Sequence, residues 1–491
     1  MGKPHALLQP YQPTAADPFD AVKAAHLLNR AGFGGTPDEI EKVRKLGPGA
    51  AVDWLLDFPD AGAETQDPED LPDLSAVEGF AKNFREMRKM FVGKTPEQRQ
   101  QIRMLLQRGN RDALFATSRW WLSRMAYGPH PLQEKLTLFW HGHFTTSFRD
   151  ERSAWLIWRQ NELLRRKAAA NFKALVKEIS RDPAMLQYLN NNQNKKGKPN
   201  ENYARELMEL FTLGIGRYTE DDVKEAARAF TGWASEGDEF VFRRGQHDDG
   251  VKKFFGRIGN LDGDDVIELI LRHPACSPYV AGKLFRFFAY EDLEPGIDAS
   301  LGQVLRDATY DLRPALKMLF RSKAFYSPKA IGAQVKSPIQ LVIGTVRMLG
   351  LELPPLPLLQ RGLSQMGQVP FNPPNVKGWP TGEAWINSAT LFARYNTCVF
   401  LTGGNVPGAG PRQWPLSDEN PKPRLRAKFK PESAGTAEET VDYWVSRLIQ
   451  RPIDPQKRRV LIDSLGDGAG DEETVRRMVQ LVVSMPEYQL C

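Results

Sequence analysis

The chain has 491 residues, of which 41% are apolar and 26% charged, with 66 lysines and arginines against 60 aspartates and glutamates. This composition is typical of a globular protein and excludes fibrous and intrinsically disordered classes. The net charge of +6 is spread thinly, so it does not indicate nucleic acid or an anionic membrane as a partner. At this length we expect two or more lobes rather than one compact core.

Cysteine usage and short motifs exclude further classes. Cys276, Cys398 and Cys491 are far apart and form no CxxC pair, which excludes a zinc ribbon and favours a reducing compartment. The sequence lacks the motifs of serine hydrolases, P-loop proteins and dinucleotide-binding proteins, so we expect no nucleotide cofactor. It also has no apolar signal segment at its start and no stretch that predicts a transmembrane segment. We therefore expect a cytoplasmic protein, or an extracytoplasmic one if a signal has been removed.

Apolar residues recur at helical spacing over most of the chain, which predicts an all-α, multi-lobed fold. The first predicted helix covers residues 20–31 and ends at Gly32, and Thr36-Pro37 begins the second, so the two form a hairpin. An acidic stretch with eight carboxylates follows between residues 57 and 78. The next predicted helices cover residues 81–91, 96–109, 111–125, 132–140, 153–166 and 170–179.

A very polar loop at residues 190–200 comes before the next helices. Because it has no helical period, we expect it to be exposed or to line a cavity. Helices are predicted at 202–213 and 220–230, and a small β-ribbon at 239–242 is the only strand that the pattern indicates. More helices follow, interrupted by an irregular Pro-rich stretch at 370–380. The predicted organisation is an N-terminal helical hairpin (1–59), an acidic connection (60–78), a main helical domain (79–400), a Pro-rich basic linker (401–436) and C-terminal helices (437–491).

Six segments of the chain resemble a bacterial family that is known only as domain of unknown function 1800. The resemblance is specific because the segments match together and in order, and it implies a mostly helical protein of this size. The matching segments are HLLNRAGFG (26–34), EKLTLFWHGHF (134–144), PNENYARELMELFTLG (199–214), AFTGW (229–233), HDDGVK (247–252) and PPNVKGWP (373–380).

Two histidines directly after the predicted helix 132–140 are candidate metal ligands. Imidazole is the commonest protein ligand for transition metals. On an ideal helix, His141 and His143 point about 200° apart, because each residue turns by about 100°. They can share a metal only if the helix ends there, which Gly142 favours. The alternative is one histidine in the core and one that caps the helix end.

Further candidate ligands lie in two other segments. Glu206 and Glu209 share one face of the predicted helix 202–213, although an amphipathic surface helix has the same pattern. His247 and Asp248 lie in a segment with little helical period, where functional side chains are easier to place than on a packed helix. The alternative there is an exposed turn whose aspartate accepts hydrogen bonds from backbone amides.

Our leading interpretation is a metal-dependent enzyme with a site of nitrogen and oxygen ligands. His141, His143 and His247, with Glu206 or Asp248, are expected to bind a divalent metal, and this donor set suits zinc, iron or manganese. The prediction requires that these residues converge in space although they lie far apart in the chain.

The donor set also indicates the reaction class. With zinc, Glu209 would be the catalytic general base and Lys252 would stabilise an oxyanion or a phosphate, so hydrolysis is favoured. Two histidines and one carboxylate on an open iron would instead favour oxygenation. The substrate and the oligomeric state are left open.

Two alternatives remain at this point. One is a non-catalytic helical scaffold or binding protein, in which the polar motifs form buried ion-pair networks. The other is glycoside chemistry by two carboxylates, which predicts a second acid near Glu206 or Glu209 in a groove lined by Trp379 and Trp385.

Overall fold

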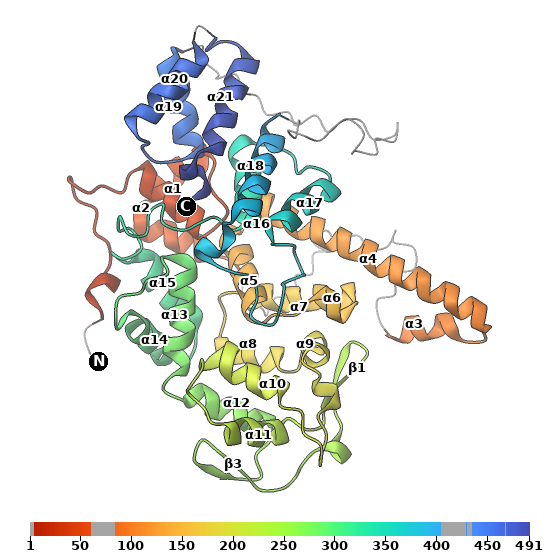
Figure 1. Cartoon of the computed structure of the whole chain (residues 1–491). Coiled ribbons are helices and arrows are strands. Elements are labelled where there is room, and N and C mark those ends of the chain that lie inside the picture. The colour runs from red at the N-terminus through yellow and green to blue at the C-terminus, as the bar shows by residue number, and fades with distance from the viewer. Residues whose placement is uncertain (1–3, 60–83, 404–428, 430–434, 467) are drawn as a thin grey trace.

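Helices dominate the architecture. The computed structural model describes residues 4–59, 84–403, 429, 435–466 and 468–491. Most of these residues are helical and the strands form only two short ribbons, which confirms the predicted all-α class (Figure 1). The predicted acidic connection and most of the predicted linker lie outside the described residues.

The N-terminal hairpin is formed as predicted. Helix α1 (Ala21–Arg30) begins where the Asp20 side chain accepts a hydrogen bond from a backbone amide of its first turn. Helix α2 (Pro37–Leu56) begins with a capping box, in which Thr36 and Glu39 satisfy each other's backbone amides. Both helices bury apolar residues in the same core as the middle of the chain.

The aromatic-rich helices follow, and one of them is longer than predicted. Helix α4 (Pro96–Tyr127) is continuous where two helices were expected at 96–109 and 111–125. Gly109 and Asn110 lie inside it, and the Asn110 side chain bonds to the carbonyl of Leu106, so these residues do not end the helix. The neighbouring helices are α3 (Phe84–Phe91), α5 (Pro131–His143), α6 (Phe148–Glu151), α7 (Ala154–Arg166), α8 (Phe172–Ile179) and α9 (Pro183–Tyr188).

The next part of the chain contains both ribbons. Strand β1 (Trp233–Glu236) pairs antiparallel with β2 (Glu239–Phe242), which confirms the predicted ribbon. A second ribbon, β3 (Lys252–Phe254) with β4 (Arg257–Gly259), was not predicted. Its strands have three residues each, which is too short for a visible alternation of apolar and polar residues. The helical elements beside the ribbons are α10 (Asn202–Glu206), the π-helical turn η4 (Leu207–Thr212) and α11 (Glu220–Ala229).

The remaining helices complete two hydrophobic cores. One core joins α1 and α2 to the segments from α5 to α15, and the other joins α4 to the helices from α16 onward. Among the described helices, none has the length and apolar sequence needed to cross a membrane. The helices that follow the ribbons are α12 (Gly263–Arg272), α13 (Cys276–Phe288), α14 (Ile297–Asp307), α15 (Leu312–Arg321), α16 (Pro338–Leu349), α17 (Leu356–Met366), α18 (Ser388–Gly403), α19 (Ala437–Leu448), α20 (Pro455–Leu465) and α21 (Glu472–Ser484).

Candidate functional site

Helix α5 carries the two motif histidines at its C-terminal end. The helix ends at His143, which is the condition that shared metal ligation would require. The Pro-rich stretch lies directly on this end. Gly378 has a φ of +85°, and a Cβ at that position would lie 2.2 Å from the carbonyl oxygen of Gly142. Only glycine fits there, so two motifs far apart in the sequence meet at this backbone contact.

His141 is enclosed by aromatic rings. Its side chain is fully buried, and its ring centroid lies 5.5 Å from that of Trp121, 5.6 Å from Phe371 and 5.4 Å from Trp379. Burial lowers the pKa of His141 to about 3, so the imidazole is neutral at physiological pH. Neither ring nitrogen has a hydrogen-bond partner among the described residues, which is rare for a buried side chain.

His143 has different neighbours. Its Nε2 donates a hydrogen bond of 3.0 Å to the carbonyl oxygen of Phe211 in η4, and its ring stacks on Phe139. Burial, and then the positive charge of Lys283, hold the pKa of His143 well below its usual range. The bond from Nε2 joins α5 to η4, while the buried Nδ1 has no hydrogen-bond partner among the described residues.

The π-helical turn frees backbone carbonyls that side chains then satisfy. The carbonyl of Leu210 accepts bonds from the Tyr279 hydroxyl at 2.9 Å and from the Lys283 ammonium at 3.2 Å. Burial lowers the pKa of Lys283 to about 8. Glu209, the predicted general base, accepts a bond of 2.7 Å from the Tyr218 hydroxyl. Turns of this kind are often found at functional sites.

Glu206 lies one turn earlier, at the end of α10, among other carboxyl groups. Its side chain is half-buried, and burial, together with the negative charge of Glu209, raises its pKa, while Lys377 in the Pro-rich stretch favours the ionised form. Tyr188, at the end of α9, has its pKa raised to about 12 by burial and by the charges of Asp150, Glu151 and Glu206. Tyr188 therefore has carboxyl groups of α6 and α10 around it.

Glu151 is the most perturbed member of this group. Burial, followed by the charges of Asp182 and Asp150, raises the pKa of Glu151 to about 8, so its carboxyl is mostly protonated at neutral pH. Its Oε2 atom is buried and has no hydrogen-bond partner among the described residues. Helix α6, which ends at Glu151, packs against α9, which ends at Tyr188.

Asp182 completes the group from the N-terminus of α9. Burial raises the pKa of Asp182 to about 6, although Gln160 and the backbone amide of Met185 donate bonds of 2.7 Å and 3.0 Å to it. We name Asp150, Glu151, Asp182 and Glu206 the carboxyl cluster; Glu206 is linked to the others through Tyr188, whose pKa its charge and those of Asp150 and Glu151 raise. Perturbed carboxyl groups gather at functional sites more often than elsewhere. Of its four members, the sequence indicated only Glu206.

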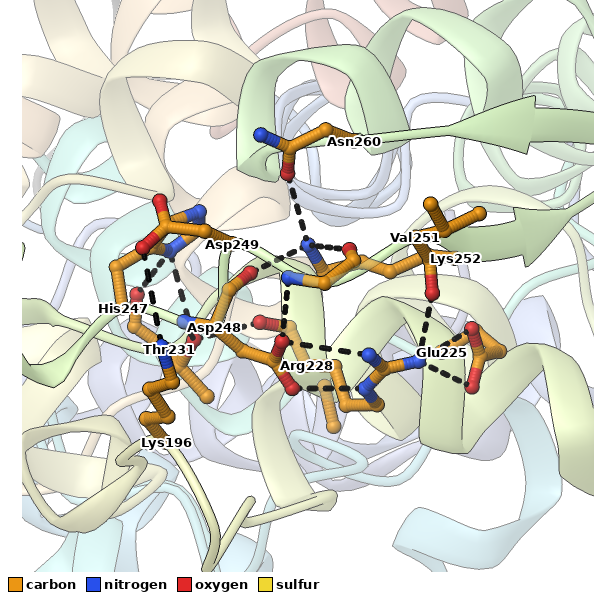
Figure 2. Close-up of polar contacts among 12 residues, drawn as sticks. Lys196, Glu225, Arg228, Thr231, His247, Asp248, Asp249, Val251, Lys252 and Asn260 are labelled. Carbon is orange, nitrogen blue, oxygen red and sulfur yellow. Dashed lines mark hydrogen bonds and ion pairs between the residues drawn. The ribbon is translucent and has the colours of Figure 1, made fainter.

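His247, Asp248 and Lys252 lie together in a separate polar network (Figure 2). The His247 Nδ1 donates to the carbonyl of Thr231 at 2.8 Å. Asp248 pairs with Arg228 at 2.8 Å, and this hydrogen bond lowers the pKa of Asp248 to about 2. Lys252 is buried and donates to two backbone carbonyls, including that of Asp248 at 2.6 Å. The Asp248–Arg228 pair thus joins this network to α11, whereas the bonds of Lys252 lie within the segment that leads into the second ribbon.

The predicted site residues thus fall into two sets. His143 is joined to η4, which begins directly after Glu206, whereas His247 and Asp248 belong to the network in Figure 2. Figure 1 shows α5 near the centre of the molecule and α11 and β3 at its lower end. Within the residues that the structure describes, no three His, Cys, Asp or Glu side chains are close enough to hold one metal ion.

Comparisons with known proteins identify the family of the chain. No significant match was found among curated proteins, and none was found among solved structures. The model of the family described as "Protein of unknown function (DUF1800)" matches residues 26–490. The match covers nearly the whole chain, including every segment on which the resemblance rests. The chain therefore belongs to the DUF1800 family.

Proposed function

We propose that this protein is a hydrolase whose acid and base are carboxyl groups of the carboxyl cluster. The observation that carries the proposal is the Glu151 carboxyl: its buried Oε2 atom has no hydrogen-bond partner among the described residues, and burial, with the charges of Asp182 and Asp150, raises its pKa to about 8. When their environments push the pKa values of two neighbouring carboxyl groups apart, the group with the higher pKa can act as the acid and the other as the base.

In this mechanism Glu151 is the general acid and Glu206 the general base. The Glu151 carboxyl gives its proton to the oxygen of the leaving group as the scissile bond breaks. Glu206 takes a proton from the attacking water; Arg205 and Lys377 favour its ionised form, against burial and the charge of Glu209, which raise its pKa. The balance is the addition of one water molecule across the bond. Cleavage of a glycosidic bond is the reaction that such a pair of carboxyl groups serves most directly.

The metal-dependent form of hydrolysis, with zinc, iron or manganese, stays a prediction. His141 supports it best, because both of its ring nitrogens lack a partner within the described chain. Elemental analysis of untagged protein beside a His141→Ala, His143→Ala variant tests it. Stoichiometric metal that is lost in the variant would support a metal site, and equal metal content would remove these histidines as ligands.

A non-catalytic scaffold is the competing proposal. It would predict hydrogen bonds between motif residues and the backbone, such as that of His143 to Phe211 and that of His247 to Thr231 in Figure 2. It does not account for Glu151. A carboxyl oxygen that is buried without a hydrogen-bond partner destabilises a scaffold, whereas a general acid requires a raised pKa.

The test is an assay of reducing-sugar release from neutral and acidic polysaccharides between pH 5 and 9. We expect hydrolysis that declines as the pH rises through about 8, because Glu151 then loses its proton. Glu151→Gln and Glu206→Gln should each lower the rate by about 100-fold or more. Glu473→Gln, at an exposed position of α21, is the control and should leave the rate unchanged. Full activity of both cluster variants, or no hydrolysis of any polysaccharide, would contradict the proposal.

A further inference from the structure

A surface hollow of about 520 Å³ lies beside the start of α10. It is built from the polar loop that the sequence predicted to be exposed or to line a cavity. The loop does line a hollow, but two of its asparagines, Asn191 and Asn194, are buried. The residues that line the hollow are Gln193, Lys195, Lys198, Pro199, Asn200 and Glu201.

The lysines of the hollow are held on a tight turn. Lys195 and Lys198 pair as an antiparallel bridge, with the Lys198 amide donating to the Lys195 carbonyl at 2.9 Å. Gly197 closes the turn with a φ of +77°, a conformation that favours glycine. Below the turn, Asn194 donates to the carbonyl of Ala227 and accepts from the amide of Asn200. The turn is therefore preorganised, which lowers the entropy that a bound ligand would cost.

The hollow has an excess of positive charge, which favours a negatively charged ligand. Within the described chain, neither Lys195 nor Lys198 forms an ion pair, whereas the neighbouring Lys196 lies 3.9 Å from Asp249. Glu201, the acidic residue of the lining, pairs with Arg205 at 3.0 Å. Two ammonium groups thus remain available for an anion.

The uncharged side chains of the lining match hydroxyl groups. Gln193 and Asn200 each carry an amide, which can both donate and accept a hydrogen bond, as the hydroxyls of a sugar require. Ammonium groups bind carboxylate or sulfate through charge-assisted hydrogen bonds. A saccharide that carries carboxylate or sulfate groups satisfies both parts of this lining.

The hollow and the carboxyl cluster are connected along the chain through α10. Gln193 follows Tyr188 by one short turn, and Glu201 directly precedes α10, which ends at Glu206. A helix of this length rises by only about 7.5 Å, or 1.5 Å for each of its residues. Glu206 therefore lies about that distance along the helix axis from Glu201 in the lining of the hollow.

We infer that the hollow is a binding subsite for an acidic saccharide, in which Lys195 and Lys198 hold the anionic groups. This inference rests on the proposed function, since it names the class of substrate for the same site. Binding and hydrolysis are nevertheless separate measurements, and each can fail without the other.

Isothermal titration calorimetry with the full-length Glu151→Gln variant tests the subsite without turnover. The probes are oligogalacturonate, which carries carboxylates, sulfated dextran oligosaccharide, which carries sulfates, and neutral dextran oligosaccharide. We expect at least one charged probe to bind and the neutral one to bind at least tenfold more weakly. The charged probe that binds more tightly identifies the anionic group.

Lys195→Gln, Lys198→Gln, introduced together, should raise the dissociation constant for the charged probe at least tenfold. The matched control is Lys45→Gln, Lys323→Gln, which removes the same net charge at exposed positions elsewhere and should leave the constant unchanged. Equal weakening in the control pair, or no binding of either charged probe, would overturn the inference. If the probe binds but wild-type protein hydrolyses no saccharide, only the proposed function fails.

Discussion

Replacing Glu151 with glutamine should change how the stability of the protein depends on pH. One carboxyl oxygen of Glu151 is buried, and burial together with the charges of Asp182 and Asp150 raises its pKa from an ordinary 4.5 to about 8 on folding. The folded state therefore binds this proton more tightly than the unfolded state does. Wild-type protein should lose stability from this group as the pH rises from 4.5 to 8, whereas glutamine cannot ionise and does not contribute this loss.

The size of the effect follows from the pKa shift. A shift of one unit corresponds to about 1.4 kcal/mol, so ionising Glu151 lowers the free energy of unfolding by roughly 3 kcal/mol between pH 4 and pH 7. The full shift gives an upper limit of about 5 kcal/mol above pH 9. The free energy of unfolding of the Glu151→Gln variant, relative to that of wild-type protein, should therefore increase steadily over this pH range.

The assay is denaturant unfolding of both proteins at several pH values from 4.5 to 9, with Glu473→Gln as a control for the same change at an exposed carboxyl. The difference between Glu151→Gln and wild type isolates Glu151 from the other titrating groups, which both proteins share. A difference that stays constant across this pH range would refute the raised pKa and remove the proposed general acid.

Two further substitutions test the packing that positions the site. Gly378→Ala should lower the unfolding midpoint far more than Gly350→Ala, because both glycines have positive φ but only a Cβ at Gly378 meets a backbone atom, the Gly142 carbonyl; similar midpoints would contradict this contact. Glu134→Gln should destabilise the protein by about 3 kcal/mol in denaturant unfolding, since it removes the buried carboxylate that pairs with Arg165 at 2.8 Å and with Arg124 at 2.7 Å, and leaves the buried Arg165 with Glu162 as its acidic partner; a loss below 1 kcal/mol would show that this pairing is dispensable.

Local sequence patterns predicted the helical elements well. The hairpin of α1 and α2 follows from helix signals within a few residues of each other, such as the capping box of Thr36 and Glu39. The helix predicted at 132–140 is also present, although α5 continues through Gly142 to His143. These signals act over one or two turns and do not depend on the rest of the fold.

The candidate site depended on contacts that a single sequence does not contain. The spacing of His141 and His143 could not indicate that one ring lies among Trp121, Phe371 and Trp379 while the other bonds to η4. Glu151 gave no signal, because α6 has only four residues and Asp182, whose charge helps to raise the pKa of Glu151, lies at the start of another helix, α9. The hollow beside α10 could be predicted in part, because the polar loop at 190–200 has no helical period and was expected to be exposed or to line a cavity.

A crystal structure of the Glu151→Gln variant with a bound acidic oligosaccharide tests the central claim most directly. We predict that the saccharide lies in the hollow beside Lys195 and Lys198 and extends along α10, with a glycosidic oxygen within hydrogen-bond distance of the residue at position 151. The carboxylate of Glu206 should face the same bond from the other side. A saccharide bound on another surface, or one in the hollow that stays clear of the carboxyl cluster, would contradict the assignment of this cluster as the hydrolytic site.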